Sequence, residues 1–273
     1  MRNKQMIPKT IHYCWFGGAP LPEKERRCIE SWRKNCPDYE IKKWDESNYD
    51  LNQNEYIRQA YKAKRWAFVT DYVRLDVIYR YGGIYLDTDV EVIRSLDPLL
   101  EDSAFAGMES VDGKQLSIAT GLGFGAEPGN EIIKEWRDIY ENLSFLGADG
   151  TQDLLTTPAR TTACLEKRGF RQQNVIQLID GMVIYPTEYF SPKQYDTHNI
   201  HITPNTYSIH HYSESWKSEK ERKASEEWAA LVKKYGKRGA EIVSAINAKK
   251  KEGGIPAVVK QMLRKLFGHR ERT

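Results

Sequence analysis

The stretch AFVTDYVRLDVIYRYGGIYLDTD, residues 67–89, decides the fold. Apolar residues recur at helical offsets throughout residues 65–81, which predicts a helix. Gly82 and Gly83 follow, and glycines at this position supply the left-handed backbone that ends a helix. Residues 84–93 then alternate as a half-buried strand does, so the pattern predicts a helix that leads through a tight turn into a strand.

Two acids stand two residues apart on that predicted strand, Asp87 and Asp89. Side chains at this spacing share one face of a strand, so both carboxylates can reach one cation or its water shell. Such oxygen ligands suit Mg²⁺ or Mn²⁺, which phosphate oxygens and water usually complete. The pair therefore indicates a diphosphate-bearing substrate. On this motif alone, an ordinary solvated strand end is the alternative.

The predicted helix carries an acid and a guanidinium, Asp71 and Arg74, on the same face as Leu75 and Ile78. Ionised groups on a packed face are costly unless they are paired or bound to a ligand. Two interpretations follow. Either these side chains bind substrate, or they form an ion pair within the helix at three-residue spacing.

The segment before this stretch predicts a βαβ unit. Residues 9–16 form a β-rich run that ends at Gly17, residues 23–34 have helical spacing, and residues 39–44 read as a second strand. This order favours a parallel sheet covered by helices. Further strands are expected at 104–108, 122–126, 175–179, 182–185 and 207–212, and further helices at 130–143, 159–167 and 219–235.

Composition describes an ordinary globular chain of 273 residues, with 40% hydrophobic and 29% charged residues. The four cysteines form no Cys-x-x-Cys pair, so neither a zinc knuckle nor a disulfide scaffold is predicted. No apolar stretch is long enough to predict a signal peptide or a membrane span. We therefore expect a cytoplasmic protein.

Charge is unevenly distributed along the chain. Residues 231–273 contain twelve Lys or Arg and three Glu, a net charge of +9, whereas the whole chain has +3. The acidic remainder argues against nucleic-acid binding by the main domain. A helix at 256–267 would carry one apolar stripe flanked by basic residues. It is expected either to contact the inner face of the plasma membrane or to pack on protein.

The run from residue 67 to residue 89 resembles the signature of glycosyltransferase family 32, which pairs Asp-x-x-Arg with Gly-Gly-x-Tyr-x-Asp-x-Asp. That family includes bacterial capsule and exopolysaccharide transferases and is similar to fungal α-mannosyltransferases and the large clostridial glucosylating toxins. The resemblance covers roughly residues 7–216. It implies a GT-A type fold, α/β with a Rossmann-like mixed sheet flanked by helices. Residues 1–216 would form the catalytic domain, and residues 217–273 a helical, basic C-terminal extension.

The resemblance also implies roles for residues outside the central run. By position, Trp15 would stack on the base of the nucleotide-sugar donor, although a core tryptophan is the alternative. The segment from residue 208 to residue 216 resembles the closing His-His and Ser-Trp segment of the family, so Ser215 and Trp216 would cover the donor diphosphate. Neighbouring residues on a strand face opposite ways, so one of the two histidines is expected at the metal, and we select His211.

Together these features predict a metal-dependent hexosyltransferase. Asp87 and Asp89 would bind Mn²⁺ or Mg²⁺, while Asp71 and Arg74 would hold the donor sugar. The resemblance implies retention of anomeric configuration and a UDP-sugar donor, with glucose, galactose and their N-acetylated forms as candidates. The acceptor would be a glycan, lipid-linked in capsule, exopolysaccharide or O-antigen synthesis.

Three alternatives stay open. GDP-mannose is the alternative donor. A non-catalytic nucleotide-sugar-binding module would keep the fold and lack turnover. A nucleotidyltransferase would also need acidic metal ligands, but the loop after the first strand, residues 17–20, lacks the lysine usual in that class.

Overall fold

A computed structural model describes residues 7–110, 115–194, 199–213 and 219–251. The chain divides into two compact units, and the second contains helix α7 (Glu219–Lys251). The helical path of α7 is interrupted at Gly236, where φ is 70° and ψ is 166°. The predicted helix at 256–267 lies outside the described residues. None of the described helices combines the length and apolar character needed to cross a membrane.

The first unit is built on a mixed sheet in the order β2-β1-β3-β7-β5-β9-β8, with β6 paired to β5. A separate two-stranded sheet pairs β4 with β10. The strands of the larger sheet are β1 (Thr10–Cys14), β2 (Glu40–Trp44), β3 (Gly83–Tyr85), β5 (Ala104–Glu109), β6 (Ser117–Ile118), β7 (Phe124–Ala126), β8 (Gln177–Ile179) and β9 (Met182–Tyr185). Those of the smaller sheet are β4 (Val90–Val92) and β10 (Ser208–His210).

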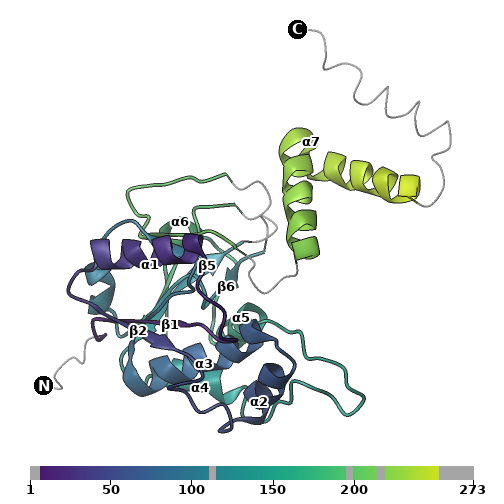
Figure 1. Ribbon diagram of the computed structural model, residues 1–273. Coiled ribbons are helices and arrows are strands. Elements are labelled where there is room, and N and C mark those ends of the chain that lie inside the picture. Colours follow the sequence, from purple (N-terminus) through teal and green to yellow (C-terminus); the bar gives the residue numbers. More distant parts are fainter. Residues whose placement is uncertain (1–6, 111–114, 195–198, 214–218, 252–273) are drawn as a thin grey trace, which may run out of the picture. The chain divides into compact units, whose positions relative to one another are not determined.

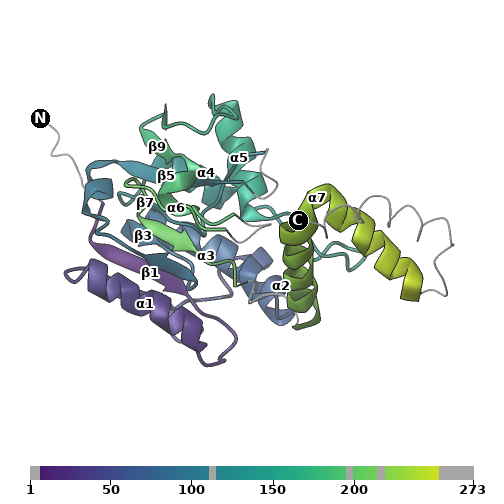
Figure 2. The same cartoon turned by 90° about the horizontal axis from the view of Figure 1, so that it is seen from above.

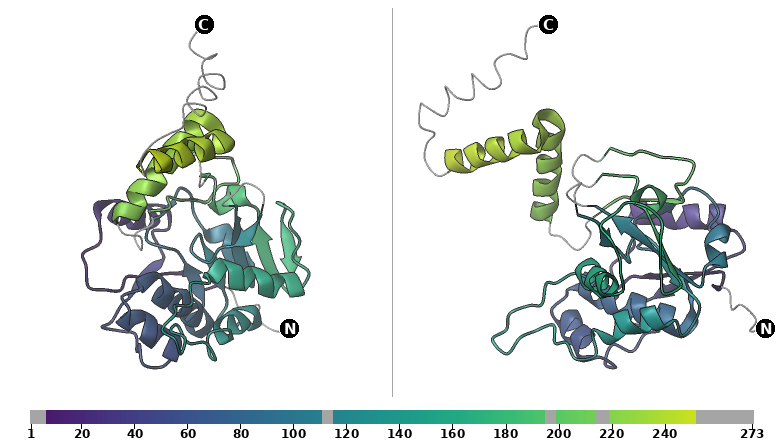
Figure 3. Two further views of the ribbon diagram at one scale, coloured as in Figure 1. Left: turned by 90° about the vertical axis from the view of Figure 1, so that its right-hand side faces the viewer. Right: turned by 180° about the vertical axis from the view of Figure 1, so that it is seen from behind.

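Helices cover both faces of the larger sheet. The helices of this unit are α1 (Glu23–Asn35), α2 (Glu55–Lys62), α3 (Trp66–Tyr81), α4 (Glu131–Asp138), α5 (Thr157–Lys167) and α6 (Thr187–Phe190), with a 3₁₀ turn η1 (Asp97–Glu101). Figure 1 shows α1 on one side of the sheet and α2, α3 and α4 on the other, and Figures 2 and 3 show these layers from other directions. Each face has its own hydrophobic core. The predicted α/β fold with a mixed sheet flanked by helices is confirmed.

The βαβ prediction is also confirmed, because β1 and β2 pair in parallel from Thr10↔Glu40 to Cys14↔Trp44. Helix α1 connects them and packs on β4. Its Trp32 is fully buried and donates a hydrogen bond from Nε1 to the Val90 carbonyl at 2.7 Å. This bond ties the first crossover helix to the small sheet that carries the site.

The prediction of one continuous strand over residues 84–93 is wrong. The chain leaves the large sheet after Tyr85, turns, and re-enters β structure at Val90 in the small sheet. Long-range hydrogen bonds cause this break, because the Leu86 N–H donates to the His12 carbonyl (3.1 Å) and the Asp87 N–H to the Gly121 carbonyl (3.0 Å). Asp87 and Asp89 therefore lie in the turn between two sheets.

Helix α3 is buried almost all round, since residues 71–78 are all buried. It packs between the large sheet and helices α2 and α4. As predicted, it ends at Gly82, whose φ is 66°. A β-carbon at Gly82 would lie 2.7 Å from the Pro128 ring, so glycine also permits this close approach.

The burial of His12 predicts a pH-dependent stability. His12 is 1% exposed on β1 and accepts a hydrogen bond on Nδ1 from Trp44 Nε1 at 3.0 Å. Burial lowers the pKa of its imidazole to about 4. The unfolded chain, with an ordinary histidine pKa of about 6.5, binds the proton more readily, so stability is complete above that pH and falls as the pH drops toward 4.

We expect this loss to approach about 3 kcal/mol at pH 4. Urea unfolding between pH 7.5 and pH 4.5 measures it. His12→Asn keeps an acceptor for Trp44 and does not titrate, so its unfolding free energy should fall less steeply over this range. Equal slopes for both proteins would assign the acid sensitivity to other groups.

Candidate functional site

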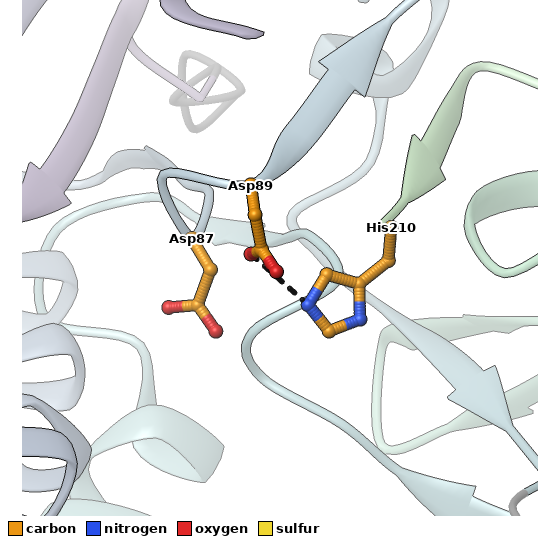
Figure 4. Close-up of side chains that lie close together, drawn as sticks. All are labelled: Asp87, Asp89 and His210. Carbon is orange, nitrogen blue, oxygen red and sulfur yellow. Dashed lines mark ion pairs between the residues drawn. The ribbon is translucent and has the colours of Figure 1, made fainter. Parts of the chain in front are cut away.

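The site lies where the two sheets meet. The turn between β3 and β4 carries Asp87 and Asp89, and β10 pairs antiparallel with β4 in the register His210↔Val90. Figure 4 shows the His210 ring pointing at Asp89, with the Asp87 carboxylate beside them. His210 Nε2 lies 3.2 Å from Asp89 Oδ1. Strand pairing over a long sequence separation thus brings an imidazole to the acidic turn.

These three side chains could hold a metal ion together. Asp87, Asp89 and His210 each offer one ligand atom, and the three atoms lie within 4.8 Å of one another. Two carboxylate oxygens and one imidazole nitrogen suit Mn²⁺ well, since carboxylates favour hard cations and imidazole binds the first-row transition metals. Such a cluster leaves coordination positions for phosphate oxygens, so its donor set fits the predicted cation.

Electrostatics keep Asp89 ionised. Burial alone would raise the pKa of this carboxyl, but His210 and the N–H of Ser213, which donates to Asp89 Oδ2 at 2.7 Å, lower it below its usual range. Burial lowers the pKa of the His210 imidazole, and Asp89 more than reverses this effect, so the net shift is upward. A metal ion would therefore compete with a proton for His210.

Asp87 is held on one side and open on the other. Tyr85 donates a hydrogen bond from its hydroxyl to Asp87 Oδ1 at 3.1 Å, and Arg74 Nη2 lies 3.5 Å from the same oxygen. The Asp87 side chain is nevertheless 28% exposed, whereas that of Asp89 is 12% exposed. Asp87 is thus both oriented by protein groups and accessible to a ligand.

Arg74 links Asp71, the acid predicted to bind sugar, to Asp87 in the group of three side chains that could hold a metal ion. Its Nη2 also lies 3.2 Å from Asp71 Oδ1, so the ion pair within the helix is present, but the guanidinium bridges two carboxylates. Its guanidinium carbon lies 5.0 Å from the centre of the Tyr85 ring, a cation–π contact. Burial lowers the pKa of Arg74, and Asp87 and its other anionic neighbours raise it by more, so the charge is retained.

The side chain of Asp71 is less exposed than that of Asp87. Burial raises the pKa of its carboxyl, while Arg74 and the hydroxyl and N–H of Thr157 oppose this shift. Thr157 is fully buried at the start of α5, and its hydroxyl lies 3.0 Å from that of Tyr140. The hydroxyls of Thr157, at the start of α5, and of Tyr140, just after α4, therefore lie near this acid.

The structure places His211 away from the two aspartates. Its ring Nε2 lies 2.8 Å from Glu91 Oε2, while its backbone N–H donates a hydrogen bond to the Asp89 carbonyl at 3.0 Å. Neighbouring residues face opposite ways here as expected, and the register of β10 on β4 brings His210, and not the selected His211, to Asp87 and Asp89. Register depends on long-range pairing and could not be deduced from local sequence.

The remaining predicted residues lie at the periphery or outside the described chain. Trp15 is partly buried and packs on the core, and its Nε1 donates to the Ala19 carbonyl at 2.6 Å. Its side chain therefore packs on the hydrophobic core and is still partly exposed to solvent. Ser215 and Trp216 lie outside the described residues.

Sequence reasoning missed Tyr85, Gly121 and Glu109. Tyr85 stands inside the stretch that decides the fold, and its position two residues before Asp87 was the available signal. Glu109 ends β5 and is buried, which raises the pKa of its carboxyl, while the hydroxyls of Ser117 and Tyr212 and the charge of His210 oppose the shift. No local pattern distinguished Glu109 from any other strand end.

Comparison with known proteins identifies the same region. Residues 22–106 match the family described as "glycosyltransferase sugar-binding region containing DXD motif". This range covers both aspartates of the turn, together with Asp71 and Arg74.

Two curated relatives illustrate the range of similarity. Inositol phosphoceramide mannosyltransferase 3 of Schizosaccharomyces pombe is 38% identical over 119 residues, which cover 39% of this chain and 31% of the relative. Glycosyltransferase L373 of Acanthamoeba polyphaga mimivirus is 24% identical over 213 residues, covering 74% of this chain and 83% of the relative. The match with the yeast enzyme thus spans about a third of its length.

Solved structures with a similar chain path include the PaToxG glycosyltransferase, with a TM-score of 0.47, 19% identity and coverage of 60% of this chain and 70% of that one. The galactosyltransferase LgtC, in complex with donor and acceptor sugar analogs, has a TM-score of 0.37 and 16% identity over 81% of this chain and 94% of that one. Residues 22–106 of this chain are thus similar to the sugar-binding region of DXD-motif glycosyltransferases.

Proposed function

We propose that this protein is a glycosyltransferase that takes a hexose from a nucleotide-sugar and requires a divalent cation. The observation that supports this most is the cluster of Asp87, Asp89 and His210 within 4.8 Å, joined through Arg74 to Asp71. A group able to bind a metal ion and a buried acid–guanidinium pair beside it are what a sugar diphosphate requires.

The side chains have separate roles in this proposal. When bound, a divalent cation supplies charge neutralisation for the departing nucleoside diphosphate. Asp87, Asp89 and His210 would hold it. Asp71 would accept hydrogen bonds from donor sugar hydroxyls and Arg74 would orient Asp71 through their ion pair, so that the anomeric carbon is positioned for the acceptor hydroxyl. Retention of configuration is part of the proposal.

The donor is proposed to be a UDP-hexose, with Trp15 beside the base and Ser215 and Trp216 over the diphosphate. GDP-mannose is the second candidate, because two relatives are named inositol phosphoceramide mannosyltransferases and a third is named mannosyl phosphorylinositol ceramide synthase. Those names also favour an acceptor joined to a lipid. A bacterial polysaccharide pathway and a membrane contact through residues 256–267 are part of the proposal, as is the division at residues 216 and 217.

A donor screen tests the proposal. Purified protein with Mn²⁺ is incubated with UDP-glucose, UDP-galactose, their N-acetylated forms and GDP-mannose, and release of free nucleotide is measured. We expect slow hydrolysis of one UDP-hexose, abolished by EDTA and restored by Mn²⁺, since water can replace the acceptor.

Faster release of GDP from GDP-mannose would select the mannosyl alternative. Tight binding of a donor in calorimetry without hydrolysis, and without transfer to a panel of sugar acceptors, would identify a non-catalytic module. Hydrolysis that is unaffected by EDTA would overturn metal dependence.

A further inference from the structure

The backbone of the turn at residues 119–122 contacts Asp87, one of the three side chains that could hold a metal ion. It connects β6 to β7 and is closed by a hydrogen bond from the Leu122 N–H to the Ala119 carbonyl at 3.3 Å. Its Gly121 carbonyl accepts the hydrogen bond from the Asp87 N–H described above. A segment more than thirty residues away in sequence thus fixes the backbone of the acidic turn.

Gly121 also has no room for a side chain. A β-carbon built at Gly121 would lie 2.1 Å from Asp87 Oδ2 and 3.1 Å from Arg74 Nη1. Contacts below 3.0 Å essentially never occur for real β-carbons, so the Asp87 carboxylate occupies the space that any other residue would need. Only the absence of a side chain permits this approach.

Backbone conformation does not explain the glycine. Among the glycines with positive φ are Gly82, Gly83 and Gly123, but Gly121 is not one of them. A positive φ is therefore not the reason for a glycine at this position. Glycine is required at residue 121 for a steric reason, because a side chain there would collide with the Asp87 carboxylate.

Each oxygen of Asp87 therefore has its own neighbours. Oδ1 is held by Tyr85 and Arg74, whereas Oδ2 lies against Gly121. Pre-organised ligands lose less entropy on binding a metal ion, and small displacements at such sites are costly.

We propose that Gly121 is a positioning residue that holds the Asp87 carboxylate in its metal-binding orientation. The metal-related part of this inference rests on the proposed function. In Gly121→Ala we expect the methyl group to displace the partly exposed Asp87 carboxylate from its place against residue 121.

Mn²⁺ binding in the presence of UDP, measured by calorimetry, provides the first test. We expect Gly121→Ala to weaken Mn²⁺ binding at least about 10-fold, the effect typical of disturbing the support of a metal ligand. Asp87→Ala should weaken it by a similar or larger factor, and the double variant should bind no more weakly than Asp87→Ala alone. Additive losses in the double variant would overturn the proposal, because Gly121 would then act independently of Asp87.

Gly147→Ala is the matched control. Gly147 is exposed and also lacks a positive φ, and a β-carbon there would meet only the side chains of Asp149 and Thr151 within 3 Å. Its Mn²⁺ affinity should equal that of the wild type. Melting temperatures of all variants separate a loss of binding from a loss of folding.

A crystal structure of Gly121→Ala is the second test and does not depend on any activity. The expected result is an Asp87 carboxylate that has left the Tyr85 hydroxyl. An unmoved carboxylate would overturn the proposal. If the wild type bound neither Mn²⁺ nor UDP while Asp87 moved in the variant crystal, the proposed function would fail and the positioning role of Gly121 would stand.

Discussion

Asp89→Asn is expected to reduce sugar transfer about 1,000-fold at saturating Mn²⁺, equivalent to roughly 4 kcal/mol of transition-state stabilisation. The amide keeps the size of the side chain and can still accept the hydrogen bond from the Ser213 N–H. It loses the negative charge that His210 and a cation would share. Hydrolysis of the donor selected by the screen measures the loss.

Asp50→Asn is the matched control for this charge removal. Asp50 is exposed and accepts a backbone hydrogen bond from the Asn52 N–H at 2.9 Å, as Asp89 does from Ser213. Its activity should equal that of the wild type. Normal turnover by Asp89→Asn with saturating Mn²⁺ would remove the metal site from the mechanism.

Arg74→Met should destabilise the fold and abolish activity together. The substitution leaves the carboxylates of Asp71 and Asp87 without their shared cation, one of them deeply buried. Removal of one partner from a buried ion pair typically costs 3–5 kcal/mol, so we expect a loss of about 4 kcal/mol in unfolding free energy. Activity at a temperature where the variant is folded should fall more than about 100-fold.

The exposed pair of Glu55 and Arg58 on α2 offers a direct comparison, because it has the same three-residue spacing. Water screens such surface pairs, so Arg58→Met should leave stability and activity essentially unchanged. Urea unfolding of both variants, with donor hydrolysis, completes the test. Equal stability of Arg74→Met and the wild type would show that the buried cation is dispensable.

The sequence predicted most helices and strands that are determined by residues close together in the chain. The helix that became α3, its glycine end and the βαβ unit depend on periodicity and turn residues that lie within a short window. Helix α2 was missed although its Asn54 cap accepts a hydrogen bond from the Ile57 N–H, a recognisable start signal. That omission was avoidable.

The errors at the site have a different origin. The alternating residues after Gly83 satisfy a strand pattern, yet contacts with His12 and Gly121 end β3 at Tyr85. Which histidine reaches the two aspartates depends on which residue of β10 stands opposite Val90. Both are decided by segments distant in sequence, so neither could be read from the motif itself.

The pairing of β4 with β10 has a consequence for biosynthesis. Glu91 and His211, which meet beside the acidic turn, are 120 residues apart in the chain. During translation the aspartates emerge long before the strand that brings them an imidazole, so the nascent chain cannot bring Asp87, Asp89 and His210 together until β10 has left the ribosome. Under the proposed function, catalytic competence would therefore be acquired late, after all described strands of the larger sheet have been synthesised.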